Sequence, residues 1–325
     1  MNHQRILKIA SALALILAFL VVGACLAFMP SPQEDGYEFV GTWGEKGSGP
    51  GAFHDPTGIV AHGKQVFVAD ARNARIQVFD LTGAYQFQFG TRGKESGQLE
   101  RPMNLTIANN ELYVPDYWND RIEVFTLEGM PVKTIGHTGS DPGAFEAPGG
   151  VAVTENGDLF VADFYNQRIQ RLNADGSFHS QLGTTKQIGI RAGAFNYPTD
   201  VALGPDGTLY VADGYNDRIQ SFSRDGQFLH KWGGPFAINI FGPFNGWFAT
   251  VTSIAVDRKG HIFVADFYNH RIQKFEPDGT FLTAFGKEGT GPGEFHYPLA
   301  VTVTDDGNVF VTDFGNNRIQ KWQPQ

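Results

Sequence analysis

The sequence predicts an all-β fold, a six-bladed β-propeller of four-stranded antiparallel blades. Three observations predict it: a ten-residue segment recurs six times, short strand-like runs alternate with turn signals, and helical periodicity is absent from the repeats. The copies are VADARNARIQ, VPDYWNDRIE, VADFYNQRIQ, VADGYNDRIQ, VADFYNHRIQ and VTDFGNNRIQ. Their aspartates are 46 to 53 residues apart, a period typical of arrays and propellers: Asp70, Asp116, Asp163, Asp213, Asp266 and Asp313.

One repeat, Pro148–Gly183, contains the runs GVAV, DLFVAD, RIQRL and SFHSQLG, which are rich in Val, Phe, Leu and Ile. The turns ENG and NADG place Asp or Asn near Gly, which supplies the positive φ that tight hairpins need. Each repeat is therefore a meander of four strands. A unit of this size cannot bury both faces alone, so the units must pack face to face around an axis.

The two ends of the chain indicate how the ring closes. An outer-strand segment occurs six times, but its first copy, residues 36–44, precedes the first repeat. The chain ends at RIQKWQPQ, one strand short of a complete last blade. We expect residues 36–44 to supply that strand and remove two exposed sheet edges.

The pattern PTDVALGPDGTLYVADGYNDRIQSF, residues 198–222, resembles the NHL repeat, and its echoes cover residues 36–325. The resemblance implies a six-bladed propeller. It implies little about activity, because such propellers include enzymes, RNA readers and protein-binding platforms. A formal net charge of −9 disfavours a nucleic-acid partner, because such proteins need a basic surface to displace counterions from phosphates.

The N-terminus predicts a membrane attachment. Residues 1–8 carry Arg5 and Lys8, and residues 9–29 form a run of 21 uncharged, mostly apolar residues, enough for a transmembrane helix. We expect residues 1–29 to be a signal anchor or lipoprotein signal, residues 30–35 a polar tether, and the propeller, residues 36–325, to lie on the extracytoplasmic side.

Cys25 leaves two interpretations of this segment open. It lies in VGAC, which resembles the lipobox of bacterial lipoproteins, where cleavage precedes a cysteine that is then acylated. The residues after it stay apolar, which a retained transmembrane helix explains better. Because Cys25 is the only cysteine, no disulfide bond can brace the propeller.

The repeated Asp and Arg, such as Asp163 and Arg168, are predicted to be structural because every blade carries them. Asp is expected to accept turn amides, Arg to pair with a carboxylate or carbonyls, and Asn166, Asn216 and Asn269 to adopt a left-handed turn conformation. Function is then expected where the copies differ.

Two departures predict a binding face. The loop of residues 234–250 lacks the Phe-x-x-Pro ending of the other links and is unusually apolar. It is a channel lid, a surface for a partner or lipid, or local packing. The turns after the repeated Asp are rich in aromatic residues, which suit a protein, peptide or glycan partner unless they pack on neighbouring loops. The candidate binding residues are Phe236, Phe241, Phe244, Trp247, Phe248, Trp118, Tyr165, Tyr215 and Tyr268.

The third departure concerns the starts of the innermost strands, where only Asn104 and Asp200 are strong oxygen ligands. Six-bladed relatives of the gluconolactonase type hold a divalent cation in the channel, so the resemblance leaves a Ca²⁺ or Zn²⁺ ion open; we expect no other cofactor. No G-x-S-x-G motif is present for nucleophilic catalysis. The sequence thus favours a membrane-tethered binding platform over a metal-dependent lactonase or lyase.

Overall fold

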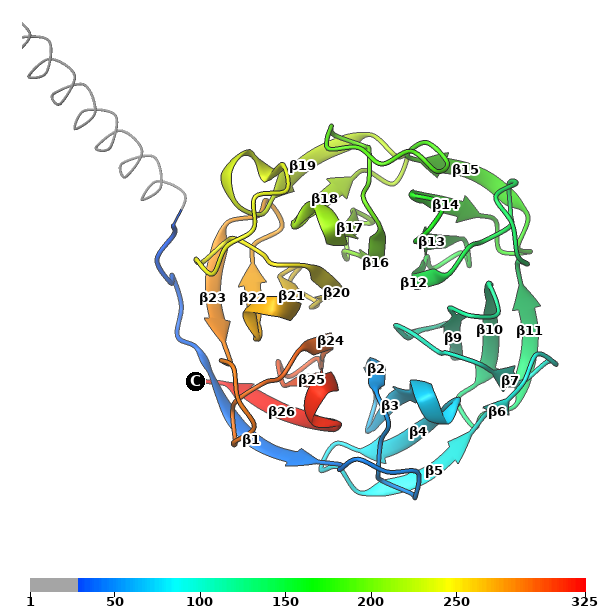
Figure 1. The fold of residues 1–325 in the computed structure, drawn as a ribbon, viewed down its shortest axis with the longest axis horizontal. Helices are drawn as coiled ribbons and strands as arrows, with labels where there is room; N and C mark the ends of the chain where they lie inside the picture. Colours follow the sequence, from blue (N-terminus) through cyan, green and yellow to red (C-terminus); the bar gives the residue numbers. More distant parts are fainter. Residues whose placement is uncertain (1–28) are drawn as a thin grey trace, which may run out of the picture.

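The structure, a computed structural model, describes residues 29–325 as an all-β, six-bladed propeller (Figure 1). Six four-stranded sheets follow one another in chain order around a central axis, which confirms the predicted fold class. Most of the predicted anchor, including Cys25, lies outside the described residues. Within residues 29–325, no helix has the length and apolar character needed to span a bilayer.

Each blade runs from a strand beside the axis to a strand at the rim. The innermost strands are β2 (Pro56–His62), β8 (Thr106–Ala108), β12 (Pro148–Val153), β16 (Pro198–Leu203), β20 (Val251–Val256) and β24 (Pro298–Val303). The second strands are β3 (Gln65–Asp70), β9 (Glu111–Asp116), β13 (Leu159–Asp163), β17 (Leu209–Asp213), β21 (Ile262–Asp266) and β25 (Val309–Asp313). The third strands are β4 (Arg75–Asp80), β10 (Arg121–Thr126), β14 (Arg168–Leu172), β18 (Arg218–Phe222), β22 (Arg271–Phe275) and β26 (Arg318–Pro324). The rim strands are β5 (Tyr85–Phe89), β11 (Pro131–Ile135), β15 (Phe178–Leu182), β19 (Phe228–Trp232), β23 (Phe281–Phe285) and β1 (Tyr37–Trp43).

Short elements occupy some of the turns and links. Single 3₁₀ turns join second and third strands at η1 (Ala71–Asn73), η2 (Gly214–Asn216), η4 (Phe267–Asn269) and η5 (Phe314–Asn316). A further turn, η3 (Pro235–Ala237), lies in the loop of residues 234–250, and β6 (Thr91–Arg92) pairs in parallel with β7 (Gln98–Leu99).

The ring closes as the sequence predicts. Strand β1 pairs antiparallel with β26, with Tyr37 opposite Pro324 and Trp43 opposite Ile319. Tyr37 is buried in the hydrophobic cluster between the last two blades, with its ring centroid 4.7 Å from that of Phe285. Closure therefore buries apolar surface as well as pairing two sheet edges.

The residues predicted to form a tether lie against the fifth blade. The Gln33 amide donates to the carbonyl of Leu282 at 2.8 Å, and Lys274 Nζ lies 2.7 Å from Glu34 Oε1. Asn245 Nδ2 donates to the Pro30 carbonyl at 3.2 Å. The described chain thus begins beside the loop of residues 234–250.

A buried carboxylate organises each blade. In the fourth blade, Arg218 Nε donates to Asp213 Oδ2 at 2.7 Å, and both side chains are fully buried. Asp213 Oδ1 accepts the amide of Asn196 at 2.7 Å, and the remaining Arg218 nitrogens donate to linking-loop carbonyls. The repeated Asp therefore binds the loop that enters its blade, and the predicted structural role of the motif is correct in this respect.

The repeated Asn does not adopt the predicted left-handed conformation. Asn216 Nδ2 instead donates to Asp213 Oδ2 at 2.8 Å and to the carbonyl of Gly189 at 2.8 Å. The next residue, Asp217, takes positive φ, and Asp217 Oδ1 accepts the amide of Thr250 in the following blade at 2.7 Å. In five of the six turns, the residue after Asn is thus an acceptor that joins one blade to the next.

The second blade is an exception that its sequence explains. Glu123 stands where the other copies carry Gln, and Gln side chains such as Gln220 donate to the repeated Asp. A carboxylate cannot donate in this way. Arg121 accordingly pairs with Glu123, at 3.1 Å, while Asp116 accepts the amides of Glu100 and Arg101.

Replacing Arg218 with Met should lower the free energy of unfolding by about 3–5 kcal/mol, because it leaves a buried carboxylate without its partner. Urea titration followed by circular dichroism measures this loss. Arg224→Met, at an exposed position of the same blade, is the control and should cost under about 1 kcal/mol. Equal effects of the two substitutions would contradict the assigned role.

Candidate functional site

The turns after the repeated Asp and the loops that link the blades lie on one face of the propeller. Backbone bonds join them: the amide of Tyr165 donates to the carbonyl of Glu146, and that of Tyr215 to Asn196. This face, which we call the loop face, carries four exposed turn aromatics: Trp118, Tyr165, Tyr215 and Tyr268.

Three of the turn aromatics, Tyr165, Tyr215 and Tyr268, are part of two clusters of ring contacts, whereas Trp118 lies against the Arg101 guanidinium. In one, Phe164 lies 4.9 Å from Tyr197 and Tyr197 lies 5.2 Å from Tyr215, measured between ring centroids. In the other, Phe267 stacks on Tyr297 at 4.9 Å. The rings thus pack on neighbouring loops and also stay accessible. Phe164 and Phe267 belong to the aromatic turns but were not among the candidate binding residues. Tyr197 and Tyr297 were not predicted, although both stand in the Phe-x-x-Pro links as the Tyr before Pro.

The loop of residues 234–250 divides its apolar residues between surface and core. Phe236 and Phe241 are 70% and 71% exposed, and Phe244 is also exposed. Trp247 is 7% exposed and Phe248 is fully buried in the cluster between the fourth and fifth blades. The prediction that Trp247 and Phe248 contact a partner is therefore corrected, because their rings pack inside the protein.

A pocket of about 690 Å³ lies between this loop and the turn aromatics. Phe241 and Phe244 line it from the loop, and Tyr215 and Tyr268 from the turns. Asn196, Asp217 and Asn239 add polar groups. Burial raises the pKa of Asp217 to about 6, since its single amide donor, from Thr250, does not offset desolvation. The pocket thus combines aromatic walls with a few hydrogen-bonding groups.

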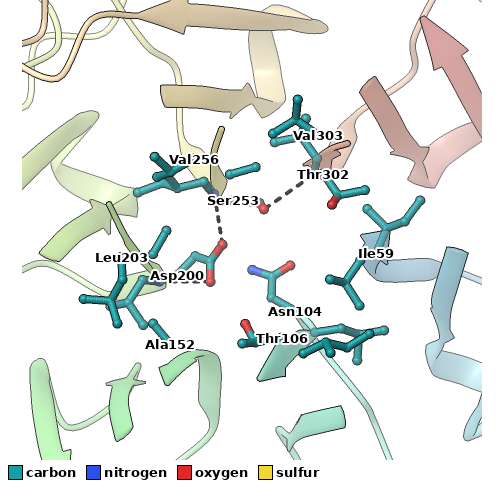
Figure 2. A pocket seen from close by; sticks show the side chains of 18 of the residues that line it. Ile59, Asn104, Thr106, Ala152, Asp200, Leu203, Ser253, Val256, Thr302 and Val303 are labelled. Carbon is teal, nitrogen blue, oxygen red and sulfur yellow. Dashed lines mark hydrogen bonds between the residues drawn. The ribbon is translucent and has the colours of Figure 1, made fainter. Parts of the chain in front are cut away.

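The central channel holds a second cavity, of about 310 Å³, lined by the innermost strands. Asn104 and Asp200 both line it, and Figure 2 shows the Asn104 nitrogen directed toward Asp200. The structure therefore brings the two predicted ligand residues together. Asp200 Oδ1 accepts the amide of Val201 and Oδ2 that of Ile254, both at 2.9 Å.

Asp200 is the main titratable group of the channel. Complete burial raises its pKa to about 7, although the amides of Ile254 and Val201 and the side chains of Ser253 and Asn104 lower it in part. Gly150 leaves room for this carboxylate, because a Cβ there would lie 2.0 Å from Asp200 Oδ1.

The channel residues are a poor fit to a cation site. Within residues 29–325, no cluster of three or more His, Cys, Asp or Glu side chains has an arrangement suited to a metal ion. Asp200 directs both oxygens to backbone amides, and Ca²⁺ takes six to eight oxygen ligands. Asn104 and Asp200 alone do not supply such a set.

Comparison with known proteins identifies the repeats. Four segments match the NHL repeat, at residues 145–172, 195–222, 248–275 and 295–322. They lie in the third to sixth blades, so the chain carries NHL repeats on a six-bladed propeller. A stretch of 58 residues is 40% identical to the Drosophila melanogaster protein brain tumor, covering 18% of this chain and 6% of that protein.

Solved structures with this fold include enzymes. A gluconolactonase from Xanthomonas campestris has a TM-score of 0.61 at 13% identity, covering 84% of this chain and 87% of the other. A streptogramin B lyase has a TM-score of 0.59 at 16% identity, covering 84% and 94%. At such low identity the likeness concerns the fold alone.

The Asp200 carboxyl should make stability pH-dependent. Its pKa is about 7 in the folded protein and ordinarily 3.8, so the folded state holds a proton that the unfolded state has lost between these values. The contribution of the Asp200 carboxyl to the free energy of unfolding is fully present below about pH 4 and is lost as the pH rises through 7. Relative to Asp200→Asn, the native protein should lose a few kcal/mol of unfolding free energy between pH 4 and pH 8, at about 1.4 kcal/mol per pKa unit.

Urea unfolding of both proteins across this pH range measures the difference. Both contain Asp217, so its titration cancels in the comparison. Parallel stability curves for the two proteins would contradict the raised pKa.

Proposed function

We propose that this NHL-repeat propeller is a membrane-tethered, extracytoplasmic platform that binds a protein or peptide through its loop face. One observation carries the proposal: exposed aromatic side chains gather around the 690 Å³ pocket between the loop of residues 234–250 and the turns. Aromatic residues are enriched where proteins contact one another and are often the residues that contribute most to affinity.

The exposure of the loop supports a binding role. Phe236, Ile240 and Phe241 are exposed within a few residues of each other, and Phe241 lines the pocket together with Tyr215 and Tyr268. Scattered single apolar residues on a surface need no explanation, but a contiguous group next to a pocket favours an interaction site. The pocket volume lies within the ~300–1,000 Å³ of ordinary ligand sites, which suits a side chain or short peptide.

The tethering proposal rests on the sequence of residues 9–29 and on where the described chain begins. Pro30 contacts Asn245 of the loop through the bond described above. A membrane segment that ends at residue 29 would therefore meet the propeller beside the candidate binding loop. The binding face would then lie close to the membrane surface.

Site-specific photocrosslinking tests the binding face. A benzoylphenylalanine at position 241 should give a crosslinked partner in intact cells, whereas the same group at position 229 should not, because Leu229 is exposed on the rim strand of the fourth blade. Phe241→Ser should then weaken binding of the identified partner at least tenfold, as expected for an aromatic anchor. Leu229→Ser is the matched control and should bind normally.

Three results would change the proposal. Equal crosslinking at positions 241 and 229 would reject the loop face as the site. Selective binding on a glycan array, lost in Phe241→Ser, would replace the protein partner with a glycan. Crosslinking to lipid alone would assign the loop to the membrane.

A metal-dependent lactonase or lyase is the second candidate. It is favoured by the contact between Asn104 and Asp200 in the channel and by the shared fold with gluconolactonase and streptogramin B lyase. The two residues would hold a cation only if carbonyls or waters completed its coordination. A cation bound there would act as a Lewis acid on a bound ester or lactone.

Elemental analysis of protein purified without chelator tests the enzyme hypothesis. One equivalent of Ca²⁺ or Zn²⁺ that is lost in Asp200→Ala would support it. Metal retained by that variant, or less than a tenth of an equivalent in the native protein, would reject the Asn104–Asp200 site.

A further inference from the structure

A separate pocket of about 450 Å³ opens at the mouth of the channel on the loop face. Tyr117, Trp118, Phe164 and Tyr165 form its aromatic walls. Arg101 and Asn104 are the side chains in its lining that carry charged or amide groups. The pocket therefore joins apolar walls to one cationic and one amide group, and neither the binding loop nor Asp200 is part of it.

Within residues 29–325, the Arg101 guanidinium forms no ion pair with a carboxylate. Among residues 29–325, no hydrogen bond or ion pair joins it to another side chain, and its Cζ lies 5.1 Å from the centre of the Trp118 ring. The neighbouring Asp55 is paired with Arg72. Arg101 is half-buried, and this desolvation lowers its pKa below the ordinary value. The nearby Asp55 carboxylate offsets this lowering of the pKa only in part. A desolvated guanidinium without an ion-paired carboxylate is suited to receive an anion.

A local break in the blade clamps leaves Arg101 in this position. In five links the residue before the innermost strand donates its amide to a side chain of the preceding turn: Asn317, Asp120, Gln167, Asp217 and His270. At the second blade the corresponding turn residue is Ala74, which has no acceptor. The Arg101 amide therefore donates to Asp116 of its own blade, and Arg101 lacks the positive φ of Asp55 and Tyr197.

Asn104 supplies a second, independent feature. Its side chain is more than nine-tenths buried and lines both the mouth pocket and the channel cavity. Asn104 Nδ2 donates to the Thr252 carbonyl at 3.2 Å, but Oδ1 has no hydrogen-bond partner among the described residues. A buried carbonyl oxygen without a partner costs free energy that a ligand N–H or O–H would recover.

We propose that the mouth pocket binds a carboxylate carried on an aromatic or apolar body, with Arg101 holding the carboxylate and Asn104 Oδ1 accepting a hydrogen bond from the ligand. The aromatic walls would stack on the body of the ligand. Two sources share this chemistry, a small organic acid and the C-terminal carboxylate of a peptide. The site shares Trp118 and Tyr165 with the loop face, but it goes beyond the proposed partner surface because it depends on Arg101 and Asn104 and does not use Phe241 or its pocket.

Isothermal titration calorimetry on the full-length protein in lipid nanodiscs tests the site with paired probes. A panel of small acids, including indole-3-acetate and phenylpropionate, is compared with the corresponding amides, and peptides ending in Trp or Phe are compared as free acids and amides. At least one acid should bind about tenfold or more tightly than its amide, because a charge-assisted bond contributes about 1.5–3 kcal/mol. Arg101→Gln should abolish this preference, and Arg101→Lys should keep part of it.

Lys186→Gln is the matched control, because it removes one positive charge from an exposed pair on the same face and does not line the pocket. Unchanged unfolding midpoints show that the variants are folded.

Binding of only the small acids, or only the peptide acids, would identify the source of the carboxylate. Equal binding of acids and amides, no binding by any acid, or a preference retained in Arg101→Gln would overturn the proposal. Phe241→Ser should leave binding of the acids unchanged. A failure of the mouth-pocket proposal can therefore be distinguished from a failure of the proposed partner surface.

Discussion

A buried carboxylate at the end of the second strand joins each blade to the loop that enters it. In the fourth blade Asp213 accepts bonds from Arg218, Asn216, Gln220 and the amide of Asn196, so its charge is paired and its oxygens are satisfied. Burying such a charge is favourable only with this degree of compensation. The loop face depends on the network, because the same bonds that hold the linking loops also fix the turns that carry the exposed aromatics.

The blades are joined to one another by a second set of bonds and by apolar packing. The left-handed residue after the repeated Asn reaches the next link, and at the closure of the ring Asn317 Oδ1 accepts the amide of Asp55 at 3.0 Å. Between blades, each hydrophobic cluster takes side chains from two adjacent sheets; in one of them the rings of Trp232 in the fourth blade and Phe275 in the fifth have their centroids 6.1 Å apart. These contacts let a chain without a disulfide bond in its propeller form a rigid ring.

The split between repeated and variable residues explains where the candidate sites lie on the loop face. The repeated polar residues are used by the scaffold, and the residues that vary between blades are left to meet solvent or ligand. The fifth link is the longest, and its extra residues form the wall of one pocket. In the second link the bond between blades is missing, because Ala74 has no side-chain acceptor. Arg101, whose amide donates to Asp116 instead, lines the other pocket. Both candidate sites therefore lie where the repeat departs from its pattern.

The sequence by itself determined the number of blades, the strand order within each and the closure by residues 36–44, because these depend on local periodicity and on turn residues that recur. It also indicated Asn104 with Asp200 as the polar residues of the channel. Only the tertiary structure separated buried Trp247 and Phe248 from exposed Phe236 and Phe241, since burial is decided by adjacent blades. The same reason explains why Arg101 was missed: whether its guanidinium has an ion-pair partner depends on what the neighbouring turns place around it, which the local sequence does not show.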